Sequence, residues 1–322
     1  MTARLCLKAR PTPAQLADRL RPLPDGSMPE GLELYLDVGD IADQAAMEAA
    51  VRRLEAAPVP EGFAWLIEGP VGSLDGAFFD VTRSAEADAL VVERLAWMAQ
   101  RIGAKAVNIH VIAPSDDLDR LTSACHDTLL RRCVPFLQHF TDTIIAAGAV
   151  PTVENMPPVL RMREGGYFFT PIGMAAADLL WLAQEIPGLA ILPDTSHAGL
   201  YLNARALAEG RGTGLGEAWG DGHVWREPLL RFLRHGLPSE PDSLLGYVRQ
   251  FGGRCANAQV SNAAGILGEG LPYAEGDFNL APAIAWLGEH ARHIVTETLE
   301  ANQDDARWMR DAYQRMRAVL AR

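Results

Sequence analysis

The sequence is poor in positive charge. Across 322 residues, 29 Lys and Arg face 41 Asp and Glu, which gives a formal net charge of −12. A field of this sign repels phosphate backbones and anionic membrane surfaces. No uninterrupted apolar run approaches the roughly 20 residues that a membrane span requires. We therefore expect neither nucleic acid nor a membrane as a partner of this chain.

Cysteines are also few, and none has the paired spacing typical of zinc or redox motifs. The four cysteines, Cys6, Cys125, Cys133 and Cys255, are scattered, and no cationic stretch followed by an apolar core opens the chain. This pattern is typical of a reduced cytoplasmic protein. We interpret each cysteine as a small buried hydrophobe.

Short apolar runs rich in β-formers alternate with longer amphipathic runs, which is the pattern of βα units around a parallel sheet. The expected strands cover residues 3–9, 32–38, 63–69, 106–112, 150–155, 189–194, 255–261 and 293–298. The expected helices include residues 42–57, 84–102, 170–186 and 303–321. Eight strands, each followed by a helix, predict an α/β fold of the (β/α)8 TIM barrel type. No linker or change of composition divides the chain, so residues 1–322 are predicted to form a single domain.

The connection between the sixth and seventh strands is unusually long, at about 60 residues, and exceeds what one helix and two short loops require. We interpret residues 195–254 as including a lid-like insertion. Its stretch 209–225 holds six glycines and two tryptophans. No strand leads into this stretch and no Gly-Lys-Ser/Thr follows it, so a flap over the barrel mouth is favoured over a phosphate loop. Its candidate substrate-binding residues are Trp219, His223 and Trp225.

Polar side chains occupy the strand ends, and in a barrel these ends converge on one mouth. The residues are Glu68, His110, Glu154, Asp194 followed by His197, Gln259, and Glu297. Burying an unpaired charge there would cost several kcal/mol. Lys8 on the first strand can pair with one carboxylate but cannot neutralise Glu154, Asp194 and Glu297 together. A divalent cation is the simplest compensation.

The types of ligand then select the metal. Three carboxylates and the amide oxygen of a glutamine form an all-oxygen set, which suits Mn²⁺ or Mg²⁺ better than structural Zn²⁺. The predicted ligands are Glu154, Asp194, Gln259 and Glu297, with Mn²⁺ as the first choice and Mg²⁺ or Co²⁺ as alternatives. His197 is expected to face the substrate as a hydrogen-bond donor or proton carrier. Taken singly, each of these residues also has a structural explanation, such as a salt bridge or a core histidine, and only their combination indicates a metal site.

The segments that carry these residues resemble the xylose isomerase-like superfamily of TIM barrels. They read TVENMP, LPDTSHAG, NAQVSNAAG and IVTETLE, and the resemblance runs over residues 30–300. The superfamily includes sugar epimerases, hydroxypyruvate isomerase, inosose and dehydroshikimate dehydratases, and endonuclease IV. The resemblance implies metal ligation by the four residues named above and substrate contact by His197. It also implies that Glu154 and Glu297 act as the acid/base pair.

Two departures narrow the branch that the sequence resembles. Gln259 stands where the epimerases and endonuclease IV have His, and it matches the hydroxypyruvate isomerase and dehydratase branches. Glu68 stands where endonuclease IV has a metal-binding His, which disfavours a multinuclear zinc site. In the glycine-rich segment 263–280, Glu269 could reach the mouth, although a solvated loop carboxylate is the alternative.

These observations predict a metal-dependent isomerase or epimerase. Its substrate would be a small polyhydroxylated carbonyl compound, namely a sugar, a keto acid or a cyclitol, and proton transfer would pass through a metal-stabilised enediolate. The predicted catalytic residues are Glu154, Glu297 and His197, and Glu68 and His110 are further candidate substrate contacts. A dehydratase that expels a β-hydroxyl is the alternative. An endonuclease IV-like phosphodiesterase and a ligand-binding barrel without catalysis are less favoured, and a homo-oligomer is left open.

Overall fold

The structure, a computed structural model, describes residues 2–113, 121–161, 167–211 and 223–322. Eight parallel strands among these residues form one sheet, with the spatial order β8, β5, β4, β3, β2, β1, β12, β9. Their bounds are β1 (Arg4–Ala9), β2 (Gly31–Tyr35), β3 (Ala64–Glu68), β4 (Ala106–His110), β5 (Val150–Glu154), β8 (Ala190–Leu192), β9 (Asn257–Val260) and β12 (His293–Thr296). Bridges from Ile191 to Cys255 and from Asp194 to Gln259 join β8 to β9 and close the ring. The predicted (β/α)8 barrel is confirmed.

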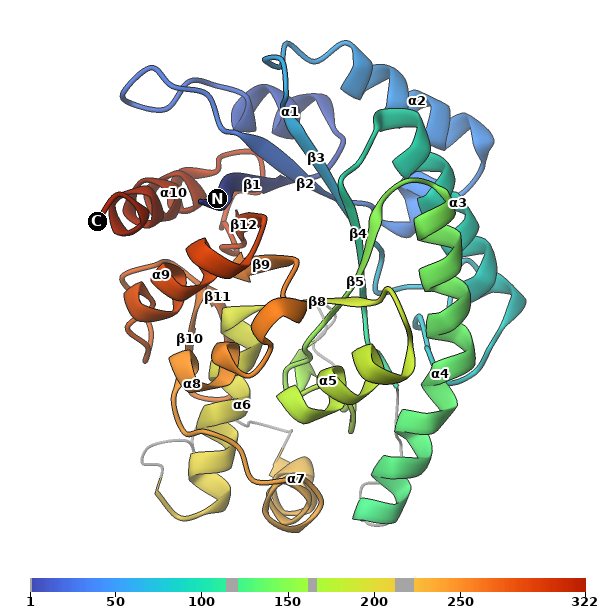
Figure 1. The fold of residues 1–322 in the computed structure, drawn as a ribbon, viewed down its shortest axis with the longest axis vertical. Helices are drawn as coiled ribbons and strands as arrows, with labels where there is room; N and C mark the ends of the chain where they lie inside the picture. The colour runs from blue at the N-terminus through green and yellow to red at the C-terminus, as the bar shows by residue number, and fades with distance from the viewer. Residues whose placement is uncertain (1, 114–120, 162–166, 212–222) are drawn as a thin grey trace.

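Helices surround this barrel, and α2, α3 and α4 follow one another along its outer side (Figure 1). The helices outside the β8 to β9 connection are α1 (Pro13–Arg19), the 3-10 turn η1 (Val38–Ile41), α2 (Gln44–Glu55), α3 (Glu86–Ile102), α4 (Ser123–Ala146), α5 (Ala176–Glu185), α9 (Ala281–His290) and α10 (Arg307–Leu320). The helix predicted for 170–186 begins only at Ala176. Gly173 has a φ of +82°, a left-handed conformation that an α-helix does not contain.

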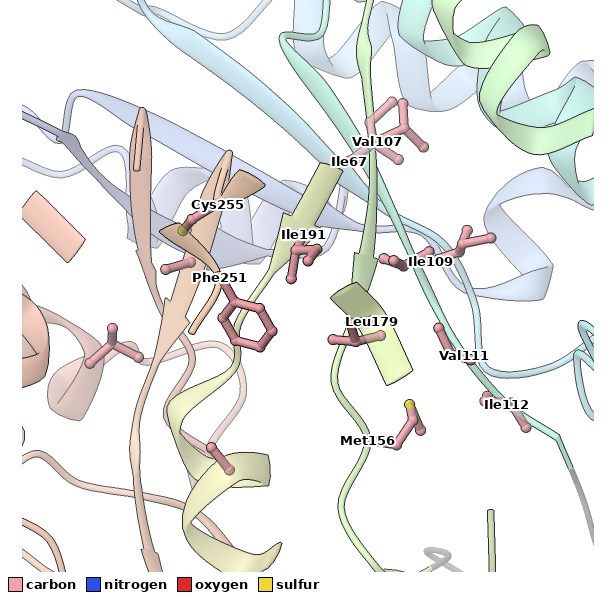
Figure 2. Close-up of a cluster of buried hydrophobic side chains, with 14 of the residues drawn as sticks. Ile67, Val107, Ile109, Val111, Ile112, Met156, Leu179, Ile191, Phe251 and Cys255 are labelled. Carbon is pink, nitrogen blue, oxygen red and sulfur yellow. The ribbon is translucent and has the colours of Figure 1, made fainter. Parts of the chain in front are cut away.

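Residues alternate along each strand between an apolar outer face and a mixed inner face. The outer residues pack against the helices, and Figure 2 shows Ile67, Val107 and Ile109 of β3 and β4 in this layer with Leu179 of α5. Inside the barrel, a separate small cluster contains Cys6, Leu66, Ala106 and Val295. This inner apolar layer closes one end of the barrel, since the polar inner residues come later along the same strands.

The long connection between β8 and β9 is largely helical where it is described. It contains α6 (Thr195–Ala208), α7 (His223–His235), α8 (Leu244–Arg249) and the 3-10 turn η4 (Gly252–Arg254). Helix α6 packs against α7, α8 and a hairpin formed by β10 (Asn262–Ala264) and β11 (Gly268–Leu271). The candidate Trp219 lies outside the described residues. His223 and Trp225 are described only as backbone positions in α7.

Smaller features complete the description. The short strands β6 (Leu160–Arg161) and β7 (Tyr167–Phe168) pair with each other. The first strand, β1, and the last helix, α10, lie side by side (Figure 1). All four cysteines are free thiols; Cys6, Cys133 and Cys255 are buried as predicted, but the prediction is wrong for Cys125, which is exposed. Among the helices of the described residues, none combines the length and apolar character needed to cross a membrane.

Candidate metal centre and active site

Glu154, the last residue of β5, is fully buried at the barrel mouth. Its Oε2 accepts a 2.6 Å hydrogen bond from Nδ2 of Asn108 and lies 3.6 Å from Nε2 of His110. Its Oε1 lies 3.0 Å from Nδ1 of His197. That nitrogen, however, lies 2.8 Å from the carbonyl oxygen of Asn155, which can only accept a hydrogen. Oε1 of Glu154 consequently keeps no hydrogen-bond partner among the described residues.

The Asp194 to His197 spacing is the start of helix α6. Oδ1 of Asp194 accepts a 2.7 Å hydrogen bond from the backbone N–H of His197, so Asp194 is the N-cap of the helix. Asn155 joins this helix start to the end of β5, because its side chain bonds both the N–H and the carbonyl of Asp194. Nε2 of His197 lies 3.3 Å from Oε1 of Glu269. One helix terminus thus holds a carboxylate and an imidazole beside Glu154.

A second group of charged side chains at the mouth comes from β1, β2, β3 and the residue after β12. The ammonium of Lys8 forms ion pairs with Glu68 and Glu297. Nε2 of Gln259 donates hydrogen bonds to Oε2 of Glu33 at 2.7 Å and to Oε2 of Glu68 at 2.8 Å. Lys8 therefore compensates part of the negative charge here, and Glu68 is the one of these carboxylates that both Lys8 and the amide of Gln259 contact.

Three of the four predicted ligands present a buried oxygen that has no hydrogen-bond partner in the described part of the chain. These atoms are Oε1 of Glu154, Oε1 of Gln259 and Oε2 of Glu297. A buried polar atom without a partner costs about 1–3 kcal/mol, and more where it carries charge. Hard divalent cations take oxygen ligands of these types. The residues present therefore fit a divalent cation.

The ionisable ligand atoms of the mouth form three overlapping groups within the described residues. The groups are Glu154 with Asp194 and His197, Glu68 with His110 and Glu154, and Glu33 with Glu68 and Glu297. In each group the ligand atoms lie within 4.8 Å of one another. The structure thus brings Glu154 and Asp194 together, and it places Glu297 in the neighbouring group with Lys8. Gln259 lies between them, since it bridges to Asp194 along the sheet and bonds Glu33 and Glu68.

The electrostatics of this cluster follow from burial and from close charges. Burial raises the pKa of Asp194 to about 6 and, helped by the charge of Glu68, that of Glu33 to about 8. Burial also acts to raise the pKa of Glu154, but His110 and His197 outweigh it and lower that pKa to about 2. The burial of His197 acts in the opposite direction to its neighbours, and Asp194 and Glu154 hold its pKa well above the usual range. Burial and close charges thus shift the pKa of four groups at the mouth, Glu33, Glu154, Asp194 and His197.

Glu269 lies in β11 of the β10–β11 hairpin, within the segment 263–280, and its carboxylate faces His197 at the mouth. Its side chain is about one-third exposed and contacts His197. The hairpin is fixed to α6, because the N–H of Gly270 donates a 2.9 Å hydrogen bond to Oγ of Ser196. Glu269 is therefore one wall of the mouth, held through the same helix that carries His197.

Glu33, Asn108 and Asn155 are site residues that the strand-end reasoning missed. Glu33 lies in the middle of β2, between the outward Leu32 and Leu34, and is 1% exposed. The alternation of apolar and polar residues in LELYL was a usable signal, since it points Glu33 and Tyr35 to one face of the strand. Asn108 and Asn155 carried no comparable signal, because their role is to bond other side chains and backbone.

Comparison with known proteins identifies relatives by structure only. No protein-family model and no curated sequence matches the chain. A D-tagatose 3-epimerase-like protein matches with a TM-score of 0.62 at 12% identity, covering 99% of this chain and 98% of its own. The 3-keto-D-glucoside 4-epimerase of E. coli matches with a TM-score of 0.60 at 12% identity, covering 98% and 99%. An AP endonuclease of family 2 from Brucella melitensis matches with a TM-score of 0.53 at 14% identity, covering 96% and 98%.

At sequence identities this low, the structural matches establish only the fold of the chain. A xylose isomerase domain protein from Planctomyces limnophilus is also among the matches, with a TM-score of 0.53 at 11% identity over 99% of this chain and 96% of its own. The chain has the TIM barrel fold of these structures, and the fold that the resemblance implied is confirmed.

Proposed function

We propose that this chain is a divalent-metal-dependent isomerase or epimerase that acts on a small polyhydroxylated carbonyl compound. The observation that carries the proposal is the set of buried oxygens on Glu154, Gln259 and Glu297 that have no hydrogen-bond partner among the described residues; Glu154 ends β5, Gln259 lies in β9 and Glu297 follows β12. Together with Asp194 they supply four oxygen-donor residues of the kind that Mn²⁺, our first choice, or Mg²⁺ or Co²⁺ takes. When bound, such a cation polarises a carbonyl and stabilises negative charge on the adjacent oxygens.

The side chains of the mouth suit proton exchange at a carbon next to a carbonyl. Glu154 and Glu297 come from β5 and from the end of β12, so the substrate carbon would lie between them, with one carboxyl taking the proton and the other returning it. Nδ1 of His197 faces the carbonyl oxygen of Asn155 and Nε2 faces Glu269, so a substrate hydroxyl would bond Nε2 by taking the place of Glu269. The position of the returned proton decides between isomerisation and epimerisation.

Structural relatives support sugar chemistry, because several are named as epimerases of sugars. They include the L-ribulose and D-psicose 3-epimerases besides the two epimerases described above. The second candidate is a dehydratase, and the observation that favours it is Gln259 at the position where the sequence resembles the dehydratase branch. In both reactions Glu154 would remove a proton from carbon. They differ in whether a β-hydroxyl leaves.

The test is turnover of ketoses, keto acids and cyclitols in deuterated water with Mn²⁺ present. We expect solvent deuterium on the product carbon, and a product 18 mass units lighter in light water would identify the dehydratase. Glu154→Gln should abolish turnover while the melting curve stays cooperative. Glu61→Gln, a change to an exposed glutamate, is the matched control and should leave turnover unchanged. Turnover without any exchange, or an unaltered rate in Glu154→Gln, would contradict this mechanism.

A further inference from the structure

The amide of Gln259 has a fixed orientation, although an amide side chain has nearly the same shape when it is turned by 180°. Its NH2 group faces two carboxylate oxygens, on Glu33 at 2.7 Å and on Glu68 at 2.8 Å. Carboxylate oxygens of this kind accept hydrogen bonds, so the carbonyl oxygen of the amide cannot occupy the same place. Oε1 is consequently turned the other way, where it is buried and has no partner in the described chain.

We infer that Glu33, assisted by Glu68, is a positioning residue that turns the oxygen of Gln259 toward the cation. This inference rests on the proposed function, because it concerns the same metal site. A reversed amide would direct two N–H donors at a cation and its oxygen at two carboxylates, and both contacts are repulsive. Metal-binding side chains are held in this way by outer hydrogen-bond partners in many sites. Glu33 performs this role from the middle of β2, which β3 and β4 separate from β5.

Glu33 is more specific to this task than Glu68. Glu68 also pairs with the ammonium of Lys8 and lies 3.6 Å from His110, so changing it disturbs several contacts. Within the described residues, the one side-chain hydrogen bond of Glu33 joins it to Gln259. When Glu33 is protonated, its carbonyl oxygen can still accept from the amide, and Glu68, which pairs with Lys8, keeps an acceptor beside the same NH2 group. Glu33 is therefore the residue to vary.

The experiment compares two variants that remove the same charge. Glu33→Gln keeps an acceptor within reach of Gln259, and Glu33→Met keeps the side-chain length but removes the acceptor. Mn²⁺ binding to the purified full chain is measured by calorimetry and by the electron paramagnetic resonance signal of free Mn²⁺. We expect Glu33→Met to bind Mn²⁺ about 10- to 100-fold more weakly than wild type, with Glu33→Gln between the two. Metal-free melting curves establish that each variant folds.

The same changes are then made in a Gln259→Glu background. A carboxylate ligand has two equivalent oxygens and needs no orientation, so Glu33→Met and Glu33→Gln should bind Mn²⁺ equally there. An equal loss in both backgrounds would mean that Glu33 contributes only its charge, and it would overturn the inference. If Glu33→Met does not fold, Glu33→Gln alone decides the question. Its loss of Mn²⁺ affinity must then be larger in the chain with Gln259 than in the Gln259→Glu background. Wild-type protein that binds no Mn²⁺ would overturn the proposed function as well, whereas wild-type binding with no effect at Glu33 would overturn only the inference.

Discussion

Lys8 offers the sharpest perturbation of the charge balance inside the barrel. Its ammonium is 12% exposed and pairs with Glu68 and Glu297, whose side chains are 3% and 20% exposed. In Lys8→Met the two carboxylates remain in the mouth without their cation. Removing one partner of a buried pair costs about 3–5 kcal/mol, because the other partner stays desolvated. The metal-free variant should therefore be markedly less stable than the wild type.

The size of the effect in a melting experiment follows from the chain length. For 322 residues the entropy of unfolding is about 0.7 kcal/mol per degree, so the loss corresponds to a decrease in Tm of about 4–7 °C. Added Mn²⁺ should restore much of it, because a ligand at 100 times its Kd contributes about 2.7 kcal/mol. Lys8→Met should gain more from Mn²⁺ than the wild type does, since the cation no longer competes with an ammonium for Glu297.

The assay is differential scanning calorimetry with and without Mn²⁺. Arg315→Met is the control, because it breaks an exposed pair with Asp311 that should contribute less than about 1 kcal/mol. The reasoning is refuted if Lys8→Met melts like the control without metal. It is equally refuted if Mn²⁺ stabilises the variant no more than the wild type.

Two further predictions concern parts of the chain beyond the ligands. Burial, with help from nearby cations, lowers the pKa of His293 to about 4, so below pH 6.5 the unfolded chain binds a proton that the folded chain does not. The free energy of unfolding should therefore decrease by up to about 3 kcal/mol between pH 6.5 and 4. His293→Gln should remove this pH dependence in urea titrations, and an unchanged pH dependence would contradict the assignment. Gly270 has a φ of +66°, and a Cβ there would collide with Leu299, so Gly270→Ala should displace Glu269 and lower kcat with metal content unchanged. Gly26→Ala is the control, because Gly26 has a φ of +81° with open space around it, and this variant should lose only about 1 kcal/mol of stability. Equal kcat in the two variants would show that the hairpin does not act on the reaction.

The strands could be predicted because their outward residues have one role, which is to pack against the surrounding helices. Outward positions such as Leu32, Leu34 and Ile67 are apolar, and the polar residue that ends each run is then visible against them. The parallel order of the strands brings these ends to one mouth, so Glu154 and Asp194 could be placed together without coordinates.

The inner contacts could not be predicted in the same way. The pairing of Lys8 with both Glu68 and Glu297 depends on the closure of the barrel, which joins β1 to β12 across the whole sequence. Asp194 was interpreted only as a ligand, although an Asp before a helical run is also an N-cap signal, and the structure shows this second role. Glu33 lies within a strand, so reasoning from strand ends does not reach it, whereas the alternation of apolar and polar residues along the strand does.

The central claim is that one divalent cation binds to oxygens of Glu154, Asp194, Gln259 and Glu297. Anomalous diffraction from crystals grown with Mn²⁺ tests it most directly. The account predicts one strong peak within about 2.0–2.4 Å of an oxygen from each of these four residues. No peak in the barrel mouth, or a peak held by other side chains, would contradict it.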